Sequence, residues 1–290
     1  MDADTRHVIR QKLDLPQLSS EQLIPVGGGS INECYSIHHE NRIYFCKINS
    51  ATKFPQLFHS ETKGLELLAS MQVIKTPVVI DCFESGNRQF LLLEWLTEGE
   101  RTKKFWSSFG TELAMLHQKK HELFGLEANN YMGSVEQLNG WSPQWIDFFI
   151  RSRLEPLKEK CLSAGLLSSR HINDLNHFYS RLHQIFDPLQ KASVVHGDLW
   201  SGNFICNTNS QAVLIDPAAY YGHPSVDLGM SRLFGGFDPV FYDAYHYHSP
   251  FPGNYEEQWK ACNLYPLMIH LLLFGRSYLP QIESTLQQFA

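Results

Sequence analysis

The chain has 290 residues, a formal net charge of −6 and 43% hydrophobic residues. This suffices for one large or two moderate cores, and its charges are mixed in sign, which excludes a basic nucleic-acid-binding tract. Six dispersed cysteines without a C-x-x-C pair predict reduced thiols in a cytoplasmic protein and no zinc site. The longest apolar stretch, residues 264–274, is too short to span a bilayer, and the polar N-terminus lacks a secretion signal, so we expect a soluble protein.

The first elements are a helix and a glycine-rich turn between strands. Residues 4–15 show helical apolar spacing. The turn is Gly27-Gly28-Gly29-Ser30, and glycines let a backbone approach a phosphate closely. Three glycines between strands are more often a plain hairpin loop, and the Gly-Lys-Ser/Thr end of a P-loop does not follow. The turn is a candidate nucleotide loop only if other residues support it.

Two charged residues follow in otherwise apolar elements. Lys47 interrupts an alternating strand pattern over residues 43–48, and Glu61 lies fourteen positions later in a segment with helical spacing. A lone Lys in such a strand usually faces solvent. Glu66, in the same predicted helix, competes with Glu61 as a partner for Lys47.

Two more strands are expected at residues 78–80 and 89–93, and the second runs directly into Glu94-Trp95-Leu96. The sequence beyond this point is predominantly helical in its apolar spacing. The clearest helices are expected over residues 105–116, 173–186 and 255–276.

Two groups of residues in the helical part have more than one interpretation. His117 and His121 are four positions apart, which would suit a metal, but the Glu of the zinc-protease motif is missing, so we expect a solvated helix end. Trp145 and Phe149 belong to an aromatic run at the start of a helix. They form either the core face of that helix or a wall of a substrate site.

The most informative stretch, residues 194–217, reads VVHGDLWSGNFICNTNSQAVLIDP. One apolar run leads into Asp198 and a second into Asp216, with a turn predicted between them. The two strands would therefore bring Asp198, Asn203 and Asp216 to one place. An Asp, an Asn and a second Asp so placed suit the handling of a metal-bound phosphate.

This order and spacing resembles the catalytic loop and metal-binding strand of the protein-kinase-like fold. Gly197 stands where protein kinases carry an Arg, and His-Gly-Asp is the form found in small-molecule kinases such as aminoglycoside and choline kinases. The longer sequence from His196 to Asn203, followed by residues 215–218 and 220–222, is similar to the fructosamine-3-kinase (ketosamine kinase) family. The aromatic run over residues 141–154 also resembles that family.

The resemblance implies an α+β, two-lobed protein-kinase-like fold. Residues 1–96 would form the N-terminal nucleotide-binding lobe, an antiparallel sheet with one main helix. Residues 97–290 would form a larger, mainly helical lobe that carries the catalytic and substrate groups. Glu94, Trp95 and Leu96 would be the hinge beside adenine.

ATP and Mg²⁺ are the ligands that the resemblance implies on the nucleotide side. The turn Gly27–Ser30 would cover the phosphates, and Lys47 would hold the α- and β-phosphates while paired with Glu61. Asn203 and Asp216 would hold Mg²⁺.

On the acceptor side, Asp198 would orient the attacking hydroxyl and receive its proton. Trp200 would lie against the sugar or its amine substituent, with Trp145 and Phe149 as further substrate contacts. Asp227 fits the buried Asp that braces the catalytic loop in relatives, and His196 is expected to be a structural hydrogen-bonding group.

The implied activity is ATP-dependent phosphorylation of the sugar 3-hydroxyl of a ketosamine, a fructosamine or ribulosamine, on a small amine or a protein. The unstable product would release the amine, which is deglycation. A kinase of another hydroxyl compound, of aminoglycoside, choline or amino-alcohol type, shares every catalytic residue. A catalytically silent nucleotide-binding module is disfavoured, because such a module has no need to retain all five residues of the kinase set, which are Lys47, Glu61, Asp198, Asn203 and Asp216. Neither nucleic acid nor membrane is an expected partner, and no oligomeric state is assigned.

Overall fold

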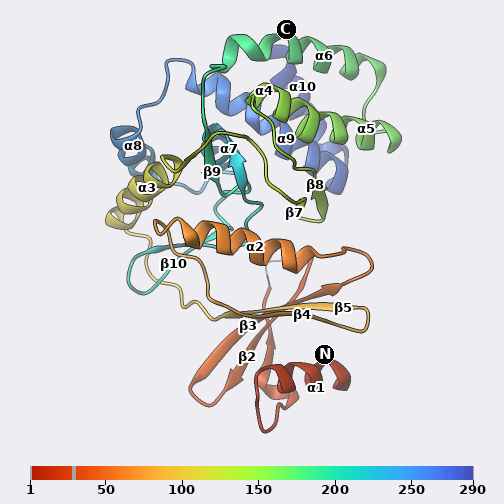
Figure 1. Cartoon of the computed structure of the whole chain (residues 1–290), viewed down its shortest axis with the longest axis vertical. Helices are drawn as coiled ribbons and strands as arrows, with labels where there is room; N and C mark the ends of the chain where they lie inside the picture. The colour runs from red at the N-terminus through yellow and green to blue at the C-terminus, as the bar shows by residue number, and fades with distance from the viewer. Residues whose placement is uncertain (1, 28–30, 290) are drawn as a thin grey trace.

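The computed structural model describes residues 2–27 and 31–289, and two parts of different architecture lie one above the other (Figure 1). One part holds an antiparallel sheet and the other is mainly helical, which confirms the predicted α+β class. Gly28, Gly29 and Ser30 of the predicted nucleotide loop lie outside the described residues.

A five-stranded antiparallel sheet in the order β1-β2-β3-β5-β4 forms the N-terminal part. Residues alternate between the two faces of a strand. Phe90 and Leu92 of β5 therefore pack on the side of α1, and Leu91 and Leu93 on the side of α2. Because helices cover both faces, the central residues 90–93 of the strand are all apolar. The elements are α1 (Ala3–Lys12), β1 (Leu23–Pro25), β2 (Glu33–His39), β3 (Arg42–Ser50), α2 (Leu57–Ser70), β4 (Val79–Ser85) and β5 (Arg88–Glu94).

The helical part is built around α9, which is buried along most of its length and contacts α5, α7 and α10. A helix enclosed on all sides needs no polar stripe, which explains why its buried central residues 264–269 are almost all apolar. The helices are α3 (Lys103–His117), α4 (Trp145–Phe148), α5 (Glu155–Ser163), α6 (Ser169–Ile185), α7 (Ser225–Leu233), α8 (Pro239–His248), α9 (Tyr255–Phe274) and α10 (Leu279–Gln288), and a π-helical turn, Phe149–Leu154, joins α4 to α5.

Short strands lie between these helices. The turn predicted between the two apolar runs is confirmed: it joins β10 to β11, with Phe204 opposite Leu214. The two runs themselves do not pair, because β9 lies between β12 and β6 in a three-stranded sheet. The strands are β6 (Lys120–His121), β7 (Asn130–Met132), β8 (Val135–Gln137), β9 (Ala192–Val195), β10 (Phe204–Cys206), β11 (Ala212–Leu214) and β12 (Tyr220–Gly222).

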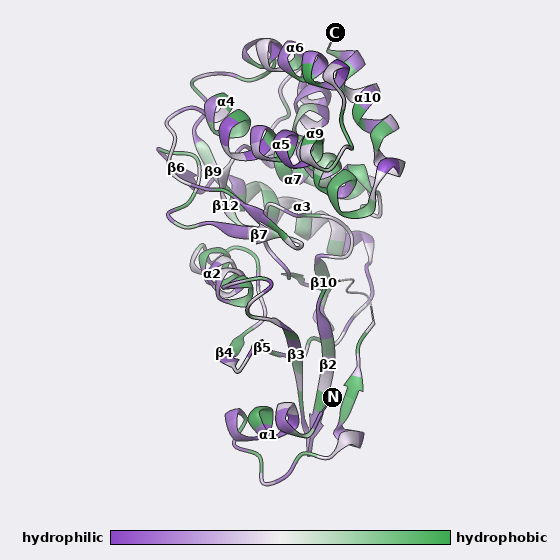
Figure 2. Ribbon diagram, turned by 90° about the vertical axis from the view of Figure 1, so that its right-hand side faces the viewer, coloured by the Kyte–Doolittle hydropathy of each residue, from purple (hydrophilic) through white to green (hydrophobic). Residues whose placement is uncertain are grey.

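The two parts meet along α2 and the β7–β8 hairpin. The side view shows α2 next to β7, and the two elements are in contact (Figure 2). The Tyr131 hydroxyl of β7 donates a hydrogen bond of 2.9 Å to the carbonyl oxygen of Pro55, just before α2. The hairpin therefore joins the helical part to the sheet part beside the cleft between them.

Candidate active site

The loop after β9 has a backbone that only glycine permits at one position. Gly197 has a φ of +84°, and a Cβ there would lie 2.2 Å from the carbonyl oxygen of Ala218. The buried carboxylate of Asp227 accepts hydrogen bonds from the backbone N–H groups of His196 (2.7 Å) and Gly197 (2.8 Å). These bonds confirm the bracing contact expected of Asp227, and they hold Asp198 at the start of the loop.

His196 is a structural residue, as expected. Its buried ring donates from Nε2 to the carbonyl oxygen of Ile215 at 2.9 Å, and Nδ1 accepts the backbone N–H of Asp198 at 3.2 Å. Burial lowers the pKa of His196, which favours this neutral form. Both ring nitrogens therefore have a hydrogen-bond partner, and the imidazole connects the Asp198 segment to the Asp216 segment.

The prediction that His117 belongs to a solvated helix end is wrong. His117 is 2% exposed, and its Nε2 lies 3.2 Å from Asp227 Oδ2 while Nδ1 lies 2.9 Å from the Tyr245 hydroxyl. Its partners stand more than a hundred positions later in the chain, so nothing near His117 in the sequence indicated them. His117 extends the support of the catalytic loop into α3 and α8.

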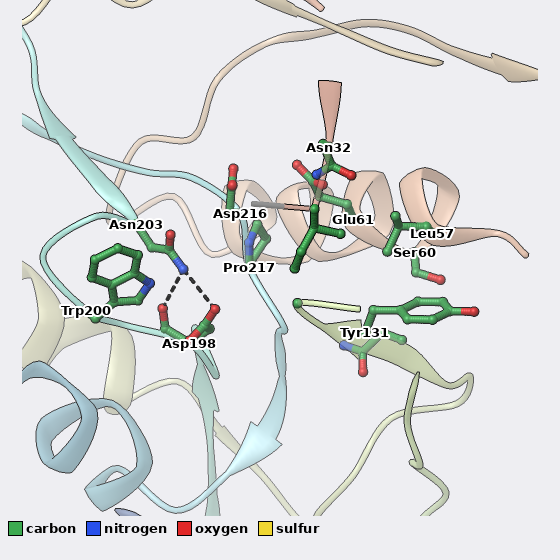
Figure 3. Close-up of a pocket in the computed structure, with 13 residues that line it drawn as sticks. Asn32, Leu57, Ser60, Glu61, Tyr131, Asp198, Trp200, Asn203, Asp216 and Pro217 are labelled. Atoms are coloured by element: carbon green, nitrogen blue, oxygen red, sulfur yellow. Dashed lines mark hydrogen bonds between the residues drawn. The ribbon is translucent and has the colours of Figure 1, made fainter. Parts of the chain in front are cut away.

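Asp198, Asn203 and Asp216 all line one cavity, described below as the polar pocket. The predicted strands and turn therefore do bring the three side chains together. The Asn203 amide donates from Nδ2 to Asp198 Oδ2 at 3.0 Å and to the Asp198 carbonyl oxygen at 2.9 Å (Figure 3). Burial, and next the negative charge of Asp216, raise the pKa of Asp198 to about 7. Asp216 has a φ of +54°, a left-handed conformation that Asp tolerates better than most residues and that often marks functional positions.

Lys47 connects the sheet, α2 and the Asp216 segment. Its ammonium Nζ lies 2.7 Å from Glu61 Oε1 and 2.6 Å from Asp216 Oδ1. Burial of Lys47 opposes its charge, but the two carboxylates outweigh that effect and hold its pKa above the usual range. Glu66, the competing partner, is exposed on the same helix.

Alternation along β3 explains why Lys47 points inward. Its neighbours Cys46 and Ile48 pack on the α1 side of the sheet, which leaves Lys47 on the α2 side, where Glu61 lies. Gly64 allows α2 to approach the catalytic segment, because a Cβ at this position would lie 3.2 Å from Pro217 Cγ. Sequence reasoning missed Gly64, since a glycine in a helix gives no sign of its neighbour.

A cavity of about 690 Å³ lies between the two parts and suits a nucleotide. Apolar side chains such as Phe45, Leu93 and Ile215 line one region, and Lys47 and Asp216 line another. The predicted nucleotide-side residues that line it are Gly27, Lys47, Glu94, Trp95, Leu96, Asn203 and Asp216. Glu61 does not line this cavity itself, but it forms an ion pair with Lys47, which does.

A second cavity of about 180 Å³, here called the polar pocket, lies between α2, the β7–β8 hairpin and the catalytic loop. Figure 3 shows Asp198 and Asn203 beside Trp200, with Tyr131 and Ser60 across the cavity. Trp200 lies over Gly202, where a Cβ would come within 2.3 Å of the indole ring. Sequence reasoning missed Tyr131 and Ser60, whose orientation depends on how the two parts meet.

The predicted substrate contacts of Trp145 and Phe149 are wrong. The two side chains are 3% and 1% exposed and belong to the main core of the helical part, with ring centroids 5.1 Å apart. Both face inward because α4 and the π-helical turn pack on the core with this side. They support the lobe and line neither of the two cavities.

The oxygen donors of Asn203 and Asp216 fit a magnesium ion. Mg²⁺ prefers hard oxygen ligands and usually takes only one or two protein carboxylates, with phosphate and water oxygens completing its shell. Among the described residues, no cluster of three or more His, Cys, Asp and Glu side chains is placed to hold a metal. Two donors beside a nucleotide-sized cavity match this sparse mode of binding better than an all-protein metal site.

Comparisons with known proteins give the same picture. A model of the fructosamine kinase family matches residues 1–290. A "probable ketoamine kinase" of Synechocystis sp. is 37% identical over 265 residues, which cover 91% of this chain and 88% of the relative. A crystal structure from Haemophilus somnus, assigned as a fructosamine-3-kinase, is 26% identical with a TM-score of 0.87 and covers 98% of this chain and 96% of that one.

The fold extends to more distant kinases. The crystal structure of a choline kinase from Streptococcus pneumoniae is 16% identical, with a TM-score of 0.62 and 99% of both chains covered. These structures confirm the predicted kinase-like fold. Within residues 2–27 and 31–289, no helix combines the length and the apolar character needed to cross a bilayer.

Proposed function

The chain belongs to the fructosamine kinase family, and from this premise we propose that it transfers the γ-phosphoryl group of ATP to the 3-hydroxyl of a ketosamine. The observation that carries the proposal is the meeting of Asp198, Asn203 and Asp216 in one cavity, with the Lys47 ammonium 2.6 Å from Asp216. We also propose that the lobes divide near residue 96, since the large cavity lies beside the end of β5.

Asp198 is the proposed acceptor of the proton. The hydroxyl oxygen attacks the γ-phosphorus, the bond from that phosphorus to the β–γ bridging oxygen breaks, and the hydroxyl proton passes to the Asp198 carboxylate. The products are ADP and the 3-phosphate. The hydrogen bond from Asn203 and the loop held by Asp227 keep the carboxylate oriented for this step.

Lys47 is the proposed contact of the α- and β-phosphates. Glu61 holds its ammonium in place from α2, so the phosphates would meet a cation that is already positioned. Asn203 and Asp216 are the proposed Mg²⁺ ligands. When bound, the ion supplies positive charge that neutralises the β- and γ-phosphates.

The proposed role of the reaction is deglycation, in which the unstable 3-phosphate breaks down and frees the amine. A cytoplasmic location is part of the proposal, supported by six cysteines that are all free thiols.

The test is Mg²⁺-dependent ADP release from the purified protein with a synthetic fructosamine, a ribulosamine, aminoglycosides and amino alcohols, using Asp198→Asn as the blank. We expect turnover on at least one ketosamine and a phosphorus NMR signal for a sugar 3-phosphate. Turnover only on an aminoglycoside or amino alcohol would overturn the ketosamine assignment while keeping the kinase chemistry. Background ADP release with every acceptor would overturn both.

A further inference from the structure

Asp198 lies where the polar pocket meets a third cavity of different chemistry, here called the aromatic pocket. This cavity encloses about 290 Å³ and shares Asp198 and Trp200 with the polar pocket. Its other walls come from Ile31, the β7–β8 hairpin, the C-terminal ends of α7 and α9, and the turn that follows α9. The aromatic side chains that line it are Trp200, Phe234, His270, Phe274 and Tyr278.

The rings form a continuous wall centred on His270. The centroid of His270 lies 4.9 Å from Phe234, 5.4 Å from Phe274 and 5.0 Å from Tyr278, and Phe234 lies 6.4 Å from Trp200. Phe274 is 52% exposed although it is large and apolar. Aromatic surface left open beside a catalytic carboxylate indicates a binding wall and not core packing.

Among the described residues, no Lys or Arg lines the aromatic pocket to receive an anion. His270 donates from Nδ1 to the carbonyl oxygen of Pro266 at 2.7 Å, so Nε2 is the nitrogen that loses its proton in the neutral ring. Burial lowers the pKa of His270, which favours that neutral ring. Asp198 is the one Asp, Glu, Lys or Arg among the described residues that line this cavity.

The shape of a ketosamine matches this pair of cavities. The 3-hydroxyl carbon lies between a hydroxylated tail and an end that carries the amine nitrogen and its substituent. With the hydroxyl at Asp198, a tail in the polar pocket would meet Ser60, Asn130 and Tyr131. The amine end would then enter the aromatic pocket, where ring faces stabilise an ammonium group.

Resting on the proposed function, we propose that the aromatic pocket binds the amine substituent of the ketosamine and selects apolar or aromatic substituents over those that carry a carboxylate. An apolar substituent gains by leaving water against the rings. A carboxylate there would lose its hydration without meeting a cation, and it would face the negative charge of Asp198.

The test compares three ketosamines of one sugar, made from benzylamine, n-hexylamine and glycine. For the wild-type protein we expect kcat/KM for the benzylamine and hexylamine compounds to exceed that for the glycine compound by about 10-fold or more. In Phe274→Ser this ratio should fall to about threefold, mainly through KM. Because Phe274 is half exposed, the variant should fold, which its melting temperature checks.

Tyr247→Ser is the matched control, since Tyr247 is an 82% exposed aromatic residue on α8, outside all three cavities. It should leave the ratio unchanged. Equal kcat/KM for the three compounds, or a ratio that survives Phe274→Ser, would overturn the proposal.

Calorimetric titration of the same compounds without phosphoryl transfer separates this inference from the proposed function. Selective binding of the benzylamine compound without turnover would support the aromatic pocket and overturn the proposed reaction. Turnover with no selectivity among the three compounds would support the proposed reaction and overturn the aromatic pocket. Failure of the benzylamine compound to bind more tightly than the glycine compound would overturn the aromatic pocket whatever the turnover.

Discussion

The two sides of the cleft, which we propose bind the nucleotide and the acceptor, are each built from a different kind of interaction. On the nucleotide side, the Lys47 ammonium lies within 2.7 Å of carboxylates from α2 and from the Asp216 segment. On the acceptor side, Trp200, Phe234 and His270 contact one another through ring faces and edges. The nucleotide side therefore depends on a few charged groups at fixed positions. The acceptor side depends on several ring contacts, each of which contributes only part of the surface.

This difference predicts how each side responds to substitution. Removing one member of a partly buried ion cluster leaves the other charges without a partner, so the effect should be large. Removing one ring from an open aromatic wall loses part of a contact area, so the effect should be smaller and confined to the acceptor. The predictions below test this contrast in order of expected size.

Asp198→Asn, at the junction of the two sides, should have the largest effect. The amide keeps the shape of the side chain but cannot accept the hydroxyl proton, so kcat should fall by about 10³-fold. ADP release at saturating ATP measures kcat, and calorimetry with ADP should show nucleotide affinity within about twofold of wild type. Normal turnover in this variant would mean that Asp198 is not the proton acceptor.

Lys47→Met tests the nucleotide side. Glu61 and Asp216 would then lack their shared cation, and the phosphates would lose a positioned positive charge. We expect kcat/KM for ATP to fall by about 10²-fold, with the acceptor KM much less affected. Lys63→Met is the control and should match wild type, because Lys63 is exposed on α2, the helix that carries Glu61. Similar losses in both variants would show that the ion cluster has no special role.

Gly202→Ala tests the acceptor side without deleting a ring. The new Cβ would lie 2.3 Å from the Trp200 indole, so the ring must move. We expect the acceptor KM to rise by about 10-fold, a larger change than in the ATP KM. Gly253→Ala is the control, because a Cβ there has nothing within 4 Å. An unchanged acceptor KM would indicate that the position of Trp200 does not matter to the substrate.

The same contrast explains which parts of the site could be predicted from the sequence. Asp198 and Asn203 precede the β10–β11 hairpin and Asp216 follows it, so local strand and turn signals suffice to bring them together. Lys47 in an apolar strand is unusual enough to be noticed, although its distance from Asp216 became evident only in the folded chain.

The acceptor side could not be predicted in this way. Trp145 and Phe149 are aromatic, as the residues of a substrate wall would be, but the orientation of their helical segment places both side chains in the core. Phe234 directly follows α7, and His270 and Tyr278 lie on the two sides of the end of α9. Aromatic residues carry no charge that would indicate their partners. Aromatic residues specify burial or binding equally well, and only the packing of the helices decides between them.

The smallest expected effect concerns a buried histidine in the core of the helical part. His223 packs between Trp145 and Phe186, with ring centroids 5.7 and 5.0 Å away, and its Nδ1 accepts the Ser225 backbone N–H at 3.1 Å. Burial lowers the pKa of His223 to about 3. In the unfolded chain its pKa would be about 6.5, so below that pH the unfolded state binds a proton that the folded state does not.

As the pH falls from 7.5 to 5.5, His223 alone should therefore lower the free energy of unfolding by about 1 kcal/mol. Asp198, whose pKa is raised to about 7, acts in the opposite direction. His223→Gln can still accept the Ser225 N–H but does not titrate, so its change in free energy of unfolding between the two pH values should lack the His223 contribution and differ from the wild-type change by about 1 kcal/mol, even if the variant is less stable at pH 7.5. Urea unfolding at the two pH values measures this difference. His248→Gln, at an exposed position on α8, should keep the wild-type pH dependence. If His223→Gln keeps it as well, the core around His223 tolerates a charged imidazole, and the difference between the charged Lys47 cluster and the apolar surroundings of the rings does not extend into the core.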